Sequence, residues 1–195
     1  MSFQSAVPFL FAAGLPGEII ADGPNRTESF RLVANLTVPA TVPPIAFGVA
    51  YSYAALGDVS NPNGLAVTPT ATPGAATATD AFAGILINPK EHALYGDSTG
   101  ALSPVYQLPD GSWGELCTMG ILLANVTTDA STTGVSGDPL AYKITDGTIV
   151  AFKGTAVPAG TILIPGARLR TAIGTTGVTV LARIELTTVG LLAAA

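Results

Sequence analysis

The sequence predicts an all-β protein with a barrel- or sandwich-like body of antiparallel hairpins and an extended N-terminal arm. Three observations lead to this fold class. Several segments alternate apolar and polar residues with a period of two, as half-buried strands do. Clusters of Gly and Pro separate these segments about every ten residues, a spacing that is typical of sandwiches and barrels. No segment of convincing length shows the 3.6-residue period of an amphipathic helix.

The composition indicates a protein that is covered by partners. Of its 195 residues, 48% are hydrophobic and 11% are charged, and the mean hydropathy is +0.51. An average soluble domain has about 25% charged residues, so this chain has few groups that keep a free monomer in solution. We therefore expect neighbouring molecules to cover much of its apolar surface.

Residues 1–28 are predicted to form the extended arm, and residues 29–190 the β-rich body. Gly and Pro recur through the arm and disfavour a helix or a regular strand, so we expect no internal backbone pairing there. The arm also carries large apolar side chains that should contact a partner, with Arg26 and Glu28 fixing the register by pairing across that contact. The candidate contact residues of the arm are Phe9, Leu10, Phe11, Ile19, Ile20 and Arg26.

The first half of the body predicts three strands and one long loop. Phe30–Val38 alternates apolar and polar residues, whereas Ile45–Tyr53 and Phe82–Ile87 are rich in apolar, β-branched and aromatic residues. The range 57–79 is rich in Gly, Pro, Ala and Thr, and we interpret it as a long loop, with a short strand at Leu65–Thr68 as an alternative. Loops of this length are usually functional or bound to a partner.

The second half predicts three hairpins. The clearest surrounds Asp146-Gly147, because a two-residue Asp-Gly between alternating runs is the strongest short-range hairpin signal. The predicted strand pairs are Val105–Leu108 with Trp113–Val126, Leu140–Thr145 with Thr148–Lys153, and Ala167–Ile173 with Val178–Leu186.

The last hairpin gathers three of the eight basic residues of the chain, Arg168, Arg170 and Arg183, on its non-core face. If the loop Gly174–Gly177 sets the register, Arg168 lies opposite Arg183, and Glu185 lies diagonal to Arg168. Like charges directly opposite each other are unfavourable, and Glu185 would relieve part of the repulsion. Two interpretations stay open, a solvated strand face and a contact stripe for an acidic partner surface.

No combination of residues indicates catalysis, a cofactor or a metal ion. The single histidine, His92, lies in a predicted loop, and the single cysteine, Cys117, lies among apolar residues as a buried thiol would. Asp58–Gly64 resembles a calcium loop, but Pro62 occupies a ligand position and the glycine comes one position late. We therefore predict a protein that is not an enzyme.

The charge pattern argues against nucleic acid and membrane partners. The net charge is −5 and no run of Lys or Arg occurs, so the chain lacks the basic footprint of nucleic-acid-binding proteins. The stretches Ala6–Ala13 and Leu32–Gly57 are apolar or uncharged, but Pro interrupts or closely follows them. This pattern disfavours a signal peptide and a spanning helix.

Motifs in the second half of the chain resemble one protein family. They are Gly137–Tyr142, Asp146-Gly147-Thr148, Ile164–Leu169, Gly177 and the alternating strand Val180–Leu186. This series of turns and strands is similar to that of the capsid cement, or decoration, proteins of tailed double-stranded DNA phages. The segment Pro16–Pro24 also resembles the N-terminal arm of that family, so the resemblance extends over residues 14–186.

The resemblance implies a β-barrel-like body with an extended arm, bound to the outer surface of the expanded capsid. The implied partners are the major capsid protein and neighbouring copies of the chain, often as homotrimers. The range 57–79 has no counterpart in the family. The alternative is a secreted or surface β-domain that binds carbohydrate or adheres to a surface, and a hydrolase that uses His92 or a carboxylate pair ranks last.

Overall fold

The computed structural model describes residues 14–20, 23–32, 45–53, 70–75, 81–88, 107–108, 112–128 and 132–187. Every regular element within these ranges is a β-strand, which confirms the predicted all-β class. In the same ranges, no helix is long and apolar enough to cross a membrane.

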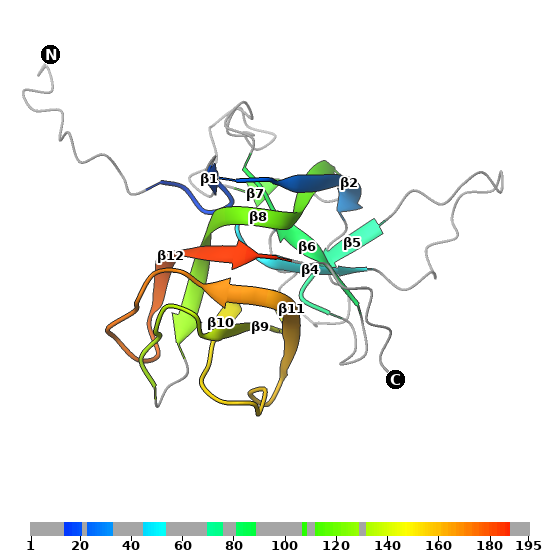
Figure 1. Cartoon of the computed structure of the whole chain (residues 1–195). Coiled ribbons are helices and arrows are strands. Elements are labelled where there is room, and N and C mark those ends of the chain that lie inside the picture. The colour runs from blue at the N-terminus through cyan, green and yellow to red at the C-terminus, as the bar shows by residue number, and fades with distance from the viewer. Residues whose placement is uncertain are drawn as a thin grey trace, which may run out of the picture.

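The described strands follow one another as shown in Figure 1. They are β1 (Ile19–Ile20), β2 (Arg26–Leu32), β3 (Ile45–Ala46), β4 (Ala50–Tyr53), β5 (Thr70–Pro73), β6 (Phe82–Leu86), β7 (Gln107–Leu108), β8 (Trp113–Thr128), β9 (Pro139–Lys143), β10 (Ile149–Ala151), β11 (Thr161–Leu169) and β12 (Thr179–Leu186).

Strand β8 belongs to two closed rings of described strands. In the large ring, β8 pairs with β12, and the order continues through β11, β9 and β10 back to β8. In the small ring, β8 pairs with β2, and the order continues through β5, β4 and β6 back to β8. Figure 1 shows β1 and β2 in line along one edge of β8. The strands of the large ring lie on the other side of β8. The body is therefore barrel-like, as predicted.

The two rings share a wall that β8 and β6 form together. Ile85 pairs with Cys117, and Leu86 pairs with Leu116. Because successive residues of a strand face opposite sides, Ile85 and Cys117 enter the core of the large ring. Leu86 and Leu116 enter the core of the small ring instead. All four side chains are fully buried, so both faces of this wall are apolar.

The turn between β9 and β10 packs tightly against the small ring. The Ala50 amide donates to the Gly147 carbonyl at 2.9 Å, the Gly74 amide to the Ala50 carbonyl at 3.1 Å, and the Ala75 amide to the Ile144 carbonyl at 2.8 Å. Gly147 has a φ of 74°, and a Cβ atom there would lie 2.2 Å from the Ala50 carbonyl oxygen. Glycine is therefore required for the two rings to approach this closely.

A buried polar contact joins the rings beside this turn. The hydroxyls of Ser52 on β4 and Tyr142 on β9 lie 2.6 Å apart, and both residues are fully buried. The ring of Tyr142 also packs against that of Phe82 on β6, with centroids 5.8 Å apart. Tyr142 of the large ring thus reaches two strands of the small ring.

Two of the three predicted hairpins are confirmed. Strands β9 and β10 pair around Asp146-Gly147, and the Asp146 side chain accepts a hydrogen bond from the Thr148 amide at 2.9 Å. Strands β11 and β12 also pair in antiparallel fashion. The third pairing is wrong, because β7 pairs with β3, and Trp113 begins the long strand β8 instead. The reason is burial, since Leu108 and Ile45 both enter the small-ring core.

Two findings depart from the predicted pattern of antiparallel hairpins. Strand β10 pairs in parallel with β8 where the large ring closes. Strand β5 pairs in parallel with β2 in the small ring. Strand β5 lies within the range 57–79 that was predicted as a loop, and its sequence, Thr70–Pro73, has no alternating pattern. The predicted strand Ile45–Tyr53 is divided into β3 and β4 by a turn at Gly48, where φ is 72°.

Part of the predicted arm belongs to the sheet. Strand β1 pairs with β8, and β2 already begins at Arg26, before the predicted boundary at residue 29. The expectation of no backbone pairing was therefore wrong for these residues, because β8 extends far enough to pair with them. Residues 1–13 and 21–22 of the arm, and residues 33–38 of the first predicted strand, lie outside the described residues.

We predict that Gly147→Ala strongly destabilises the fold, whereas Gly160→Ala does so only mildly. Gly160 has the same φ of 74° but open space around its Cα, so it isolates the cost of the backbone conformation. That cost is about 1–2 kcal/mol, and the collision with Ala50 should add about 1–3 kcal/mol. Denaturant unfolding of both variants measures the difference, and equal losses would contradict the close approach.

A second prediction concerns the buried hydroxyl pair. Tyr142→Phe leaves the Ser52 hydroxyl without this partner, which should cost about 1–3 kcal/mol of unfolding free energy. Adding Ser52→Ala should restore part of the loss, because no hydroxyl then lacks its partner. A double-mutant cycle by thermal or denaturant unfolding measures the coupling, and additive effects would refute the contact.

Candidate functional site

Arg168 on β11, Arg170 directly after it and Arg183 on β12 lie on one face, as predicted, but in a different register. Arg168 lies opposite Glu185, and the Arg170 amide donates to the Arg183 carbonyl at 2.8 Å. The predicted pairing of Arg168 with Arg183 was therefore wrong by two residues. Because side chains alternate with a period of two, this shift leaves the three arginines on the same face.

The three arginines form an outward basic surface, which we call the arginine face. Arg168, Arg170 and Arg183 are exposed, whereas Leu169 and Ile184, their neighbours in the ladder, are buried in the large-ring core. Arg170 and Glu185 form an ion pair at 2.5 Å, in which the arginine side chain is still 49% exposed. Glu185 thus balances the charge of Arg170 within this face.

Ile19 and Ile20 have different roles. Ile19 pairs with Leu122 and packs against the large-ring core. Ile20 pairs with Ile121 and shares with it the outer side of the sheet, where both are half-buried. Of these two predicted contact residues, the structure leaves Ile20 facing outward. The sequence did not reveal this difference. In a strand of only two residues, the side chain that faces the core depends on which residues of the neighbouring strand it pairs with.

The turn Leu15–Glu18 fixes the start of the described chain to the body. The Gly17 amide donates to the Leu123 carbonyl at 2.7 Å, and the Leu123 amide donates to the Glu18 carbonyl at 2.9 Å. The Asn88 amide donates to the Gly17 carbonyl at 2.9 Å. Gly17 has a φ of 82°, and a Cβ atom there would lie 2.6 Å from the Leu86 carbonyl oxygen. This turn is therefore built into the body.

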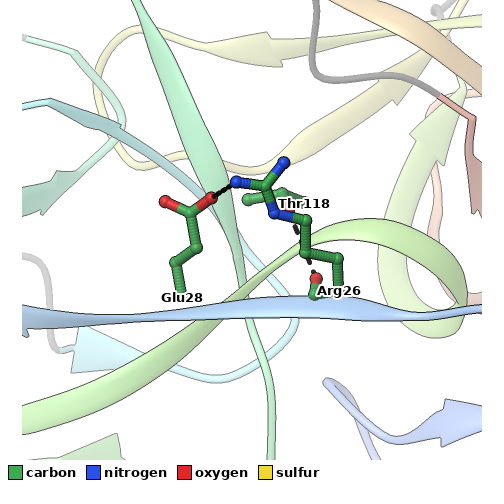
Figure 2. Close-up of polar contacts among 3 residues, drawn as sticks. All are labelled: Arg26, Glu28 and Thr118. Carbon is green, nitrogen blue, oxygen red and sulfur yellow. Dashed lines mark hydrogen bonds and ion pairs between the residues drawn. The ribbon is translucent and has the colours of Figure 1, made fainter.

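Arg26 and Glu28 pair with each other within β2, as Figure 2 shows. The guanidinium and the carboxylate lie 2.6 Å apart, with side chains 65% and 36% exposed. The Thr118 hydroxyl donates to the Arg26 carbonyl at 3.3 Å and ties this strand to β8. Partial burial raises the pKa of the neighbouring Tyr53, as does the Glu28 charge, whereas Arg26 lowers it. Arg26 is thus engaged with Glu28 inside the chain.

Cys117 is a buried thiol, as the sequence indicated. Burial raises its pKa to about 11, so the thiol stays protonated and unreactive at neutral pH. Among the described residues, no group of three or more His, Cys, Asp or Glu side chains could hold a metal ion. Phe9, Leu10, Phe11, His92 and Asp58–Gly64 lie outside the described residues.

An open groove of about 540 Å³ runs beside β10. Its lining is mostly threonines and small apolar residues, with Lys143 as its ionisable side chain. The described lining residues include no acid or base beside this amine, so they offer no pair for proton transfer. The outward arginine face and the half-buried Ile20 and Ile121 are thus better candidates for function than this groove.

Comparison with known proteins identifies the family of the chain. A family model described as structural cement protein (E217 gp24/Pam3 gp6) matches residues 3–187. A chain in the solved capsid of Myoviridae phage XM1 has a similar fold, with a TM-score of 0.56 and 16% identity over 96% of this chain and 98% of that chain. No curated protein matches by sequence. Because the family model spans nearly the whole sequence, the chain belongs to the structural cement protein family of bacteriophages.

Proposed function

We propose that this protein binds the outer surface of the phage head and stabilises the shell of the major capsid protein without catalysing a reaction. The observation that carries the proposal is the family match over residues 3–187, which gives the chain a structural role in the capsid. The low content of charged residues, 11%, supports a surface that neighbours cover.

The arginine face is the proposed contact with the major capsid protein. The chain has a net charge of −5, yet this face gathers three of its eight basic residues. Such a cluster of cations attracts an acidic surface. The arm residues Phe9, Leu10 and Phe11 are proposed to contact neighbouring subunits, including further copies of this chain in a homotrimer.

The alternative of a carbohydrate-binding or adhesive domain has one observation in its favour. Trp113 at the start of β8 is 58% exposed, and exposed aromatic rings can stack on sugars. The family match gives this alternative no support, and we therefore rank it second.

We predict that the triple variant Arg168→Gln, Arg170→Gln and Arg183→Gln binds bare expanded capsids roughly tenfold more weakly at low salt. The difference should shrink as salt rises toward 1 M, where the Debye length is about 3 Å. Folding should be retained, because all three side chains are exposed. Cosedimentation across a salt series measures both effects.

The matched control for the arginine face is Lys153→Gln, which removes an exposed cation in the loop after β10. It should bind like the unchanged chain at every salt concentration. Equal binding by the triple variant and the unchanged chain would show that the arginine face is only a solvated surface.

We predict different outcomes for two truncations of the arm. Removing residues 1–13 should leave a folded body with sharply reduced occupancy on capsids, because Phe9, Leu10 and Phe11 are lost. Burying each such side chain contributes about 1.5–3 kcal/mol. Removing residues 1–24 should also lower the melting temperature, since it deletes Ile19 from the core and the turn at Gly17.

Cosedimentation with bare expanded shells and a thermal melt of each truncated protein alone measure these outcomes. Full occupancy after removal of residues 1–13 would refute the role of the arm. An unchanged melting temperature after removal of residues 1–24 would contradict the integration of β1 into the body.

A further inference from the structure

The first half of β2 has an edge that no strand in the described part of the chain covers. On the other edge, which faces β8, the Leu32 amide donates to the Ser112 carbonyl at 2.8 Å. Backbone groups of an antiparallel strand point to alternate sides along the chain, so those of Glu28 also face β8. The amides and carbonyls of Thr27 and Ser29 therefore point away from β8, to the opposite edge.

Strand β5 occupies only the far end of this second edge. It pairs with β2 at Arg31 and Leu32, and at no other described residue. Toward its start, β2 is exposed or half-buried as far as Ser29. Pro24 sets the limit in the other direction, because proline has no amide to donate. Residues 25–29 thus leave their outward backbone groups open within the described structure, and such an edge is a template for a further strand.

The charged side chains on either side of Thr27 are complementary to a second copy of themselves. Arg26 and Glu28 extend from the same side of β2, as Figure 2 shows, and their ion pair leaves both side chains partly exposed. If two identical strands pair antiparallel about Thr27, Arg26 of each copy lies directly opposite Glu28 of the other. Like charges at such positions repel, whereas this arrangement adds an attractive pair on each side of the axis. The edge is therefore self-complementary in charge.

The backbone geometry selects the same centre. A residue on the two-fold axis of an antiparallel pair exchanges hydrogen bonds with its own copy only if its amide and carbonyl point outward, as those of Thr27 do. Arg26 and Glu28 then form the non-hydrogen-bonded pairs, in which side chains lie closest together. A centre at Ser29 fails, because residue 27 would lie opposite Arg31, where β5 already pairs. Charge and backbone geometry therefore agree independently on Thr27.

We propose that two copies of this chain pair edge to edge through residues 25–29 of β2, about a two-fold axis at Thr27. The occupant is a second copy because one segment supplies both the outward backbone groups and the complementary charges, as an isologous contact requires. The contact is small, so the free protein should dimerise weakly, and the high local concentration on a shell should favour pairing. This inference goes beyond the proposed function, since a two-fold contact differs from those of a homotrimer and needs no capsid.

A short bismaleimide cross-linker tests the register in the full chain. In a Thr27→Cys variant, the two new thiols lie on residues whose Cα atoms are about 5.5 Å apart, so a covalent dimer should form. The matched control is Ser29→Cys, whose two copies are offset along the strands by about 14 Å and should form little dimer. Cys117 does not interfere, because it is buried and its pKa is raised to about 11.

Charge reversal in the Thr27→Cys background tests the partner. Arg26→Glu or Glu28→Arg alone places like charges opposite each other on both sides of the axis, so cross-linking should fall about tenfold. Mixing these two variants restores opposite charges, and cross-linking should return as a dimer with one copy of each, which mass spectrometry identifies. The double variant Arg26→Glu, Glu28→Arg keeps the net charge and should cross-link as Thr27→Cys does. Thermal melts should show retained folding, because exposed ion pairs contribute little to stability.

Equal cross-linking of Thr27→Cys and Ser29→Cys would overturn the two-fold pairing. So would a mixture of the charge variants that cross-links no better than either one alone, or no covalent dimer of Thr27→Cys at high protein concentration. These measurements use the protein without capsids. Failure of the unchanged chain to bind shells is a separate result and bears on the proposed function alone.

Discussion

The pairing of β8 on both of its edges is the constraint on which the rest of the structure depends. This one strand of sixteen residues closes two rings and supplies side chains to both cores. Leu116 and Cys117 are adjacent in sequence, yet they enter different cores. Fixing this strand therefore fixes which side of every neighbouring strand faces inward, because each partner inherits its orientation through the ladder.

The candidate contact surface follows from this arrangement. Its members come from β1, β8, β11 and β12, which meet only because β8 pairs with β1 and β12 at the same residues, Ile121 and Leu122. The inner faces of these strands are fully committed to the large-ring core, so the outer face is left to polar and half-buried groups. Packing requirements on one side of the sheet thus leave the other side open to specify a partner.

The sequence was most informative where structure is local. The hairpin at Asp146-Gly147 could be predicted because the turn residues and the alternating flanks lie within a few positions of one another. The register of Arg168 against β12 could not, since Ile173 pairs with Gly134, which is distant in sequence, and not with Val178 across the predicted four-residue loop.

Contacts between distant segments were beyond sequence reasoning. The parallel pairing of β5 with β2 depends on ring closure and leaves no periodic pattern in Thr70–Pro73. The opposite roles of Ile19 and Ile20 depend on which residues of β8 they face. In the candidate site, the chemistry of the arginines was evident from the sequence, whereas their apolar neighbours were not.

The shared strand also sets an order of events during synthesis. The large ring uses one continuous stretch, from β8 to β12, whereas the small ring needs β2, β4, β5 and β6 from the preceding part of the chain. Because the ribosome releases the N-terminal strands first, they must wait for β8 before their ring can close. Their apolar inner faces are exposed for that interval, when unpaired strands are most prone to aggregation. The nascent chain is thus most vulnerable just before residue 113 emerges.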